Sequence, residues 1–393
     1  MKSELEKRAG VSLFDHQLEF LDAVPSLPTP VRACLYYKTG AGKSLTSLMA
    51  MVALGYERVL VIAPPATHAQ WVVLGWKMNV SVEVMSHAKF RMKDTKLSRS
   101  MPIIADEFHM FGGQKGQGWR KLDKLAMHLQ APLFLLSATP NYNDAERCYC
   151  VQHILSPHVT KGGYLQFLYE NCTTEQNPFG MEPIVTGFQD YPDAASFLAD
   201  LPRVFYLPDD LVYQIQDVAY DEELPDEFVQ LGYDRRNHRM VASLMERRHT
   251  IRYQGLVAED GTLHHHVWLK VRHFLLTATT PVLVYADHAT IAEALARTLD
   301  RERMKYAVVT GSTPKMLKHT IIHEFLSGQH PVLIGTATLA TGTDGMDRMC
   351  DTLLILDDTD DDALRRQLIG RIMPRGDFVS TADKQVVRMV PVS

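Results

Sequence analysis

The sequence predicts an α/β fold with two similar lobes, each built on a parallel β-sheet. Two blocks of the 393-residue chain alternate short apolar strands with amphipathic helices. Helices cover both faces of a parallel sheet, so its strands are expected to be apolar along their whole length. Between the blocks, over residues 160–270, the alternation stops. This change indicates a partly helical insert that joins the lobes.

Both blocks show the alternation in detail. In the first block, strands are predicted to end at Tyr36, Ala63, Met85, Ile104 and Leu136. In the second block, strands are predicted at 281–285, 307–309, 332–334 and 352–356, and helices at 290–301, 315–326 and 361–372. Apolar segments of this kind, separated by helical patterns, are typical of units that form a parallel sheet.

The segment between the blocks has a different composition. Residues 171–193 are rich in Gly, Pro, Asn and aromatic residues, which favours loops. Residues 225–253 carry many arginines, with apolar residues at helical spacing. We therefore expect an N-terminal lobe over 1–220 with an insertion after 160, a helical arm or linker over 221–270, and a C-terminal lobe over 271–393.

Composition excludes several classes of protein. Hydrophobic residues make up 46% and charged residues 22% of the chain, as in ordinary soluble proteins. No apolar run approaches the roughly 18 residues that span a bilayer, and the charged N-terminus lacks the core of a signal peptide. The net charge of −5 argues against a generally basic coat for nucleic acid. The five cysteines have no metal-binding spacing and are expected to be reduced and buried.

A phosphate-loop pattern, Lys-Thr-Gly-Ala-Gly-Lys-Ser, occupies residues 38–44 between a predicted strand and a predicted helix. In that position, backbone N–H groups at a helix N-terminus can surround a phosphate chain. Lys43 would add a positive charge, and Ser44 a hydroxyl for Mg²⁺. The strict pattern has Gly where this chain has Tyr37, so a Gly-rich turn is the alternative. The small residues of the loop are Thr39, Gly40, Ala41 and Gly42.

Two acids follow another predicted strand. Asp106 and Glu107 come directly after the apolar run 101–104. Ligands of open α/β sheets bind at the carboxyl ends of the strands, so these acids are expected at the same edge as the phosphate loop. The two motifs together indicate a nucleoside triphosphate, a metal ion and an activated water molecule.

Further motifs occur in a fixed order along the chain. One motif of the first block lies before the phosphate loop, and two lie after it. The last motif of the second block falls in a predicted helix. They are Leu-Phe-Asp-His-Gln at 13–17, an apolar run at 59–65 that leads to His68 and Trp71, Leu-Leu-Ser-Ala-Thr-Pro at 135–140, Thr-Gly-Ser at 310–312, the segment 336–344, and Gln-Leu-Ile-Gly-Arg at 367–371.

With these motifs in this order, the chain resembles the superfamily-two helicases and translocases from residue 13 to about 376. The resemblance implies two RecA-like lobes, ATP and Mg²⁺ as cofactors, and a nucleic-acid partner. The motif at 13–17, the helical insert and the segment 340–376 are most similar to chromatin-remodeller-like translocases of double-stranded DNA, and to compact phage or repair relatives. Such relatives track duplex DNA without necessarily separating its strands.

The resemblance assigns nucleotide chemistry to the first block. Phe14 would stack on adenine and Gln17 would bond the base edge, although a plain amphipathic helix explains the same residues. The loop residues 39–44 would hold the phosphates. Asp106 would organise Mg²⁺ together with Ser44, and Glu107 would position and deprotonate the attacking water.

Other residues of the resemblance would couple the nucleotide state to lobe movement. These are His109, Ser137, Thr139 and Gly342. A Ser and a Thr at a strand end can equally cap the next helix. In the second block, Asp344 and Gln367 would contact the nucleotide, and Arg371 would act as an arginine finger. The second arginine of the pattern is absent at Pro374, and we expect Arg375 to replace it.

Sequence-independent contacts with the nucleic-acid backbone are expected at strand ends, from His68, Ser86, Gly311, Ser312 and Thr336. The arginines of 225–253 either make such contacts or form a solvated helix. We thus expect a monomeric, cytoplasmic, ATP-dependent DNA motor (in the host cytoplasm if virus-encoded), acting in branch migration or DNA remodelling. The alternatives are an RNA helicase of the D-E-x-H type and a non-hydrolysing P-loop regulatory subunit.

Overall fold

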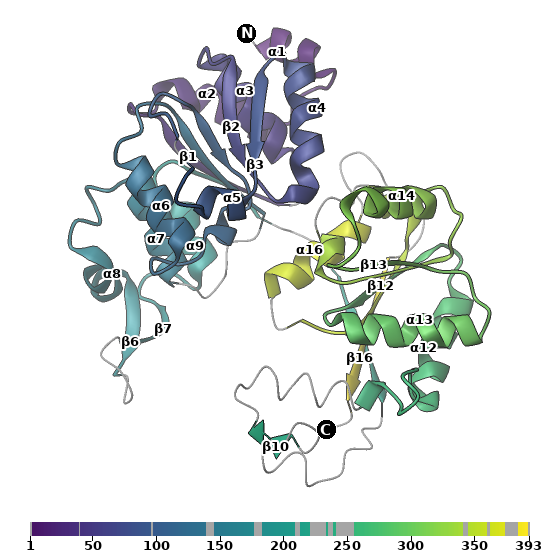
Figure 1. Cartoon of the computed structure of the whole chain (residues 1–393). Helices are drawn as coiled ribbons and strands as arrows, with labels where there is room; N and C mark the ends of the chain where they lie inside the picture. The colour runs from purple at the N-terminus through teal and green to yellow at the C-terminus, as the bar shows by residue number, and fades with distance from the viewer. Residues whose placement is uncertain are drawn as a thin grey trace. The chain divides into compact units, whose positions relative to one another are not determined.

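The computed structural model divides into two compact units, Met1–Asp210 and Leu211–Ser393 (Figure 1). The predicted α/β class with parallel sheets is confirmed in both. The first unit ends at Asp210, whereas the sequence placed that boundary at 220. The structure describes residues 2–38, 40–95, 97–138, 145–176, 183–208, 213–220, 233–234, 239–240, 255–340, 345–359, 362–373 and 384–391.

The sheet of the first unit has six parallel strands in the order β3-β2-β4-β5-β1-β8. Their bounds are β1 (Arg32–Tyr37), β2 (Arg58–Ile62), β3 (Ser81–Met85), β4 (Ile103–Ala105), β5 (Leu133–Ser137) and β8 (Val204–Leu207). Because all six are parallel, their carboxyl ends lie at one edge. The strands β4, β5 and β1 are neighbours, so the segments that follow them meet there.

Helices cover both faces of this sheet. Alternate residues of β1 enter different cores: Cys34 and Tyr36 enter one, and Ala33 and Leu35 the other. One face is covered by α1 (Lys2–Ala9), α2 (Asp15–Ala23), α3 (Lys43–Ala53) and α4 (His68–Met78). The opposite face is covered by α5 (His87–Arg91), α6 (Gln117–Ala126), α7 (Ala145–Leu155), α8 (Gly163–Asn171) and α9 (Ala194–Asp200).

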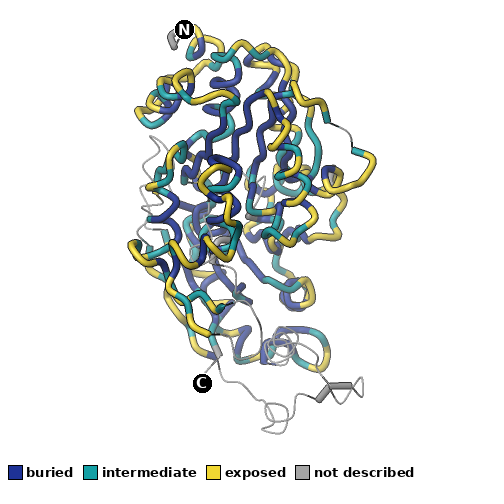
Figure 2. Tube along the Cα trace, turned by 90° about the vertical axis from the view of Figure 1, so that its left-hand side faces the viewer, coloured by how far each residue is buried: buried dark blue, intermediate teal, exposed yellow. Residues whose placement is uncertain are grey.

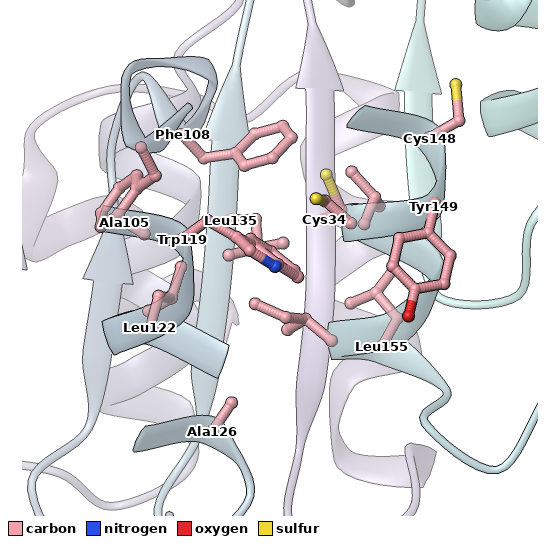
Figure 3. Packing of buried hydrophobic residues seen from close by; sticks show 14 of the residues in the cluster. Cys34, Ala105, Phe108, Trp119, Leu122, Ala126, Leu135, Cys148, Tyr149 and Leu155 are labelled. Atoms are coloured by element: carbon pink, nitrogen blue, oxygen red, sulfur yellow. The ribbon is translucent and has the colours of Figure 1, made fainter. Parts of the chain in front are cut away.

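These two cores account for the apolar strands of the first block. Figure 3 shows Cys34 and Leu135 of the sheet facing Trp119 and Leu122 of α6. The edge strands β3 and β8 are only partly buried, whereas β1, β2, β4 and β5 are buried along nearly their whole length. The exposed segments lie on the outside of the trace (Figure 2). Burial on both faces explains why the strands are continuously apolar rather than alternating.

A hairpin lies where the sequence predicted loops over 171–193. β6 (Cys172–Glu175) pairs antiparallel with β7 (Ile184–Phe188), and the hairpin extends from the unit beyond α8 (Figure 1). Thr173, Thr174 and Val185 are β-branched and suit a strand. The surrounding Gly, Pro and Asn residues obscured these short runs, because strand pairing depends on residues that are distant along the chain.

The second unit has its own parallel six-stranded sheet, in the order β13-β14-β12-β15-β16-β9. The strands are β9 (Ile215–Tyr220), β12 (Val282–Ala286), β13 (Ala307–Val309), β14 (Val332–Gly335), β15 (Thr352–Asp357) and β16 (Gln385–Pro391). One face packs on α12 (His265–Thr277) and α13 (Ala289–Arg301), and the other on α14 (Lys315–Leu326), α15 (Met346–Met349) and α16 (Asp362–Ile372).

Three strands of the two parallel sheets were not foreseen. β8 extends the first sheet beside β1, and β16 and β9 extend the second sheet beside β15. The residues of β9 were predicted to belong to the N-terminal lobe, but they pair with β16 in the second unit. Each of these strands lies at or near a sheet edge, so its place depends on a partner strand as well as on its own pattern.

The predicted helical arm over 225–253 lies mostly outside the described residues. Within it, β10 (Tyr233–Asp234) pairs antiparallel with β11 (Arg239–Met240). The backbone of these four residues therefore bonds between two strands and not along a helix. In the described parts of the chain, no helix is both long enough and apolar enough to cross a bilayer.

Candidate active site

The phosphate-loop pattern connects β1 to α3. Gly40 and Gly42 have φ values of +84° and +77°, which favour glycine. A Cβ atom on Gly42 would lie only 2.3 Å from Gln17 Nε2, so this position has no room for a side chain. The Lys43 ammonium donates to the main-chain oxygens of Tyr37 and Lys38 at 2.9 and 3.3 Å. Lys43 and Ser44 form the first turn of α3, so the loop precedes a helix N-terminus as predicted; Thr39 lies outside the described residues.

The N-terminus of α2 is bonded to this loop. The Gln17 amide oxygen accepts from the Phe14 N–H at 2.9 Å, and its nitrogen donates to the Ala41 carbonyl at 3.4 Å. His16 Nε2 donates to the same carbonyl at 3.0 Å. The Tyr37 hydroxyl donates to the His16 carbonyl at 3.0 Å. Gln17 is buried, whereas Phe14 is 46% exposed.

His16 and Tyr37 were not predicted as site residues. Tyr37 was noted only as a departure from the strict loop pattern, yet its hydroxyl and ring contact His16 across the loop. The ring of His16 also stacks on Phe14, with centroids 5.8 Å apart. A tyrosine in place of glycine therefore has a structural use here, since it joins the residues 14–17 to the strand that leads into the loop.

Asp106 lies at the end of β4 and is almost fully buried. Its Oδ2 accepts from Trp71 Nε1 at 3.0 Å, and its Oδ1 accepts from the Glu107 N–H at 3.1 Å. Its main-chain oxygen accepts from His87 Nε2 at 3.0 Å. Burial, followed by the charge of Glu107, raises the pKa of Asp106 to about 7, while the Trp71 bond and the Lys43 charge act in the opposite direction. The influence of Lys43 places the end of β4 within electrostatic reach of the phosphate loop.

Glu107 has a backbone conformation that is rare for residues other than glycine. Its φ is +47°, and left-handed backbone of this kind is concentrated at functional sites. The next residues form a short 3₁₀ helix, Phe108–Phe111. This turn brings His109 Nδ1 to 3.4 Å from Glu107 Oε2 and 3.2 Å from Ser137 Oγ. His109 thus contacts two other predicted residues, Glu107 and Ser137; Thr139 lies outside the described residues.

The strand order explains this convergence. Ser137 ends β5, which lies between β4 and β1. Neighbouring strands are about 5 Å apart, so the phosphate loop and the acidic pair stand on either side of Ser137, about 10 Å apart. An acidic pair at that distance from a phosphate loop suits a bound triphosphate with a metal ion between them.

The residues present fit Mg²⁺. This ion is held in nucleotide sites by one or two carboxylates or hydroxyls, together with substrate phosphates and water. Asp106 and Ser44 supply that small donor set. Consistently, the described ranges contain no group of three or more His, Cys, Asp or Glu side chains that would form an all-protein metal cage.

His87 and Trp71 are further residues that sequence reasoning did not place in the site. Trp71 was noted only as a landmark after His68. His87 is 3% exposed, and burial lowers its pKa to about 4. It donates from Nε2 to a carbonyl, so it is neutral with the proton on that nitrogen. Trp71 follows β2 and His87 follows β3. Nothing in the sequence around either residue indicates a hydrogen bond to Asp106.

The predicted nucleic-acid contacts of the first unit lie after β2 and β3. His68 begins α4, and its Nε2 bonds the Ala63 carbonyl at 3.0 Å. Ser86 caps α5, its hydroxyl accepting from the Lys89 N–H at 3.1 Å. Both residues therefore stand at the same edge as Asp106.

In the second unit, Gly311 and Ser312 follow β13 and are exposed, while Thr336 follows β14 and is buried. Parallel pairing of β13 with β14 brings all three to one edge. Gln367 and Arg371 lie four residues apart on α16, on the same side of that helix. The predicted residues Gly342, Asp344 and Arg375 lie outside the described residues, so the structure does not place them.

Comparison with known proteins points to one class. Residues 268–376 match the helicase conserved C-terminal domain. A putative ATP-dependent RNA helicase of Acanthamoeba polyphaga mimivirus is 19% identical over 371 residues, which cover 88% of this chain and 81% of that protein.

Among solved structures, S. cerevisiae Dbp5 bound to RNA and ADP–BeF₃ is similar with a TM-score of 0.55 and 15% identity, covering 100% of this chain and 89% of that one. A Sulfolobus solfataricus SWI2/SNF2 ATPase core in complex with double-stranded DNA has 14% identity, covering 98% of this chain and 89% of that one, but a TM-score of 0.42, too low to support an argument.

The similarity to Dbp5 shows that the whole chain has the fold of that structure. The domain match adds that the second unit carries a helicase C-terminal domain. Together these findings support a helicase-like, ATP-dependent nucleic-acid motor.

Proposed function

We propose that this protein hydrolyses Mg²⁺-bound ATP and uses the energy to move along double-stranded DNA. The observation that carries the proposal is the contact of Glu107, His109 and Ser137 beside Asp106 and the phosphate loop. Few other arrangements require a metal-binding acid, a second acid and a coupling histidine next to a helix N-terminus. Mg²⁺ would neutralise charge on the phosphates when bound.

The residues of the first unit have distinct tasks in this proposal. Lys43 and the N–H groups at the start of α3 bind phosphate oxygens. Asp106 and Ser44 would hold the metal. Glu107 orients a water molecule and accepts its proton, and His109 transmits the state of that acid to Ser137.

Replacement of Glu107 by glutamine tests this assignment. Loss of the general base should lower the ATP turnover number by about 10²–10⁴-fold. Nucleotide binding should be kept, because the amide retains the shape of the carboxylate. Glu83→Gln is the matched control, since Glu83 lies in the same unit but is exposed and paired with Arg58. Substantial ATPase activity in Glu107→Gln would contradict the proposal.

The choice of polymer needs a separate comparison. The motif pattern favours duplex DNA, whereas the names of the mimiviral relative and of Dbp5 favour RNA. The ATPase rate should be measured with duplex DNA, single-stranded DNA and RNA at equal nucleotide concentration and fixed salt, because phosphate contacts are salt-dependent. The largest stimulation by duplex DNA is expected. Stimulation by RNA alone would assign the protein to the RNA helicases, and no response to any polymer would exclude a motor.

A further inference from the structure

We infer that Trp71 and His87 are positioning residues that connect the two predicted nucleic-acid contacts of the first unit to Asp106. The inference rests on the proposed function, because it concerns how that function is regulated. Trp71 lies three residues after His68, and His87 directly follows Ser86. Each of these residues bonds a different part of Asp106.

Trp71 acts on the carboxylate. Its indole N–H can only donate, and it does so to Asp106 Oδ2 at 3.0 Å, across 35 residues of sequence. The side chain is 1% exposed and packs in the core formed with α2 and α3. A large ring held in a dense core has little freedom to turn. A movement of α4 at His68 is therefore transmitted to the orientation of Oδ2.

His87 acts on the main chain of the same residue. Its Nε2–H donates to the Asp106 carbonyl at 3.0 Å, and its ring meets the edge of Phe111 with centroids 4.9 Å apart. His87 is the first residue of α5, the helix that Ser86 caps. A change at the Ser86 cap is thus one residue away from the bond that holds the backbone of Asp106.

These two bonds have a common consequence. Asp106 is held through its side chain from α4 and through its backbone from α5, and both helices begin at a predicted backbone contact. Nucleic acid that engages His68 and Ser86 would then set the geometry of the acid that receives the metal. Because linkage is reciprocal, nucleic acid should raise the affinity for Mg²⁺, and Mg²⁺ should raise the affinity for nucleic acid.

Trp71→Phe separates this role from packing, because phenylalanine keeps an aromatic ring and loses the N–H donor. Trp119→Phe is the matched control, since Trp119 is equally buried but packs on the opposite face of the sheet. Binding of a fluorescent, non-hydrolysable ATP analogue should be measured while Mg²⁺ is varied, with and without a short DNA duplex, and again with a short RNA. Metal-free binding of the analogue provides the baseline for each protein.

In the wild-type protein, nucleic acid should lower the Mg²⁺ concentration at half-saturation. Residues that orient a metal ligand typically change metal affinity by about 10-fold or more. Trp71→Phe should therefore raise that concentration by about 10-fold and remove most of the response to nucleic acid. Trp119→Phe should keep the wild-type response, and metal-free binding should be similar in all three proteins.

A second pair of variants tests His87 independently of the stability of Trp71→Phe. His87→Gln keeps a neutral N–H donor, so nucleic acid should still lower the Mg²⁺ concentration at half-saturation. In His87→Leu this response to nucleic acid should be lost. A wild-type response to nucleic acid in both Trp71→Phe and His87→Leu would overturn the inference, but it would not contradict the proposed ATPase function. A wild-type protein that neither binds the analogue nor responds to any polymer would instead overturn the proposed function itself, and the inference with it.

Discussion

A buried acid ends a central strand in each unit, and the two acids have different surroundings. In the first unit, Asp106 accepts from the neutral indole of Trp71 and from the backbone of Glu107, whose φ is +47°. In the second unit, Asp357 Oδ2 accepts from His288 Nδ1 at 2.7 Å and from the His288 N–H at 3.0 Å.

This difference separates a candidate catalytic acid from a structural one. Asp106 stands beside an unusual backbone turn and within reach of Lys43, and burial raises its pKa. Asp357 belongs to a compact group of hydrogen-bonded side chains. His288 lies two residues after β12 and bonds Asp357, and the Tyr285 hydroxyl donates to Asp287 at 2.6 Å. The same place in a parallel sheet thus holds a candidate catalytic acid in one unit and an acid bonded to a histidine in the other.

The largest expected effect is on turnover in Asp106→Asn. Without the carboxylate that holds the metal, the ATPase rate should fall by about 10³-fold, equivalent to roughly 4 kcal/mol of lost transition-state stabilisation. Steady-state ATP hydrolysis with saturating Mg²⁺ is the measurement. A variant that retains half of the wild-type rate would remove Asp106 from the site and end the contrast with Asp357.

The difference in stability between the wild-type protein and Asp106→Asn should depend on pH in a defined direction. Because the folded-state pKa is raised to about 7, the charged form disfavours folding, and the stability linked to this group is lost as pH rises from about 4 through 7. Replacement by a neutral amide should therefore be tolerated best at pH 8. Urea unfolding of both proteins at pH 5 and pH 8 checks this sign.

An intermediate effect is expected from Gly42→Ala. The added Cβ would meet Gln17 Nε2, and alanine would be strained at φ +77°. Affinity for ATP should fall by about 10-fold, because the loop must shift away from the phosphates. Gly55→Ala is the control: Gly55 has φ +84°, but nothing lies within 4 Å of its Cβ position. It should lose about 1 kcal/mol of stability and bind ATP normally.

The smallest effect is expected from Asp357→Asn, and it should fall on stability alone. Loss of the charge that accepts two bonds from His288 should lower the free energy of unfolding by about 2 kcal/mol. Equilibrium urea denaturation measures this change, and binding of ATP to the first unit should be unaltered. A fall in nucleotide affinity with no change in unfolding would reverse the contrast drawn between the two acids.

Much of the fold could be predicted from the chain alone. The segments 307–309 and 315–326 were predicted with the bounds that β13 and α14 have, and most other elements differ by one or two residues. Apolar strands and amphipathic helices can be predicted from the local sequence, because their periodicity reflects which faces are buried. β8, β9 and β16 were not predicted, because a strand at or near a sheet edge owes its place to its partner.

The candidate site shows the same division. The residue types at the phosphate loop and at Asp106 and Glu107 indicate nucleotide chemistry from their order alone, since each motif is a local solution to binding phosphate or metal. Their mutual placement follows from the strand order β4-β5-β1, which no local pattern contains. The bond from Trp71 to Asp106 joins residues 35 apart in sequence, and it exists only because α4 packs against the sheet. The types of residue in the candidate site could therefore be predicted from the sequence. The contacts that orient these residues arise only when distant segments pack in one core.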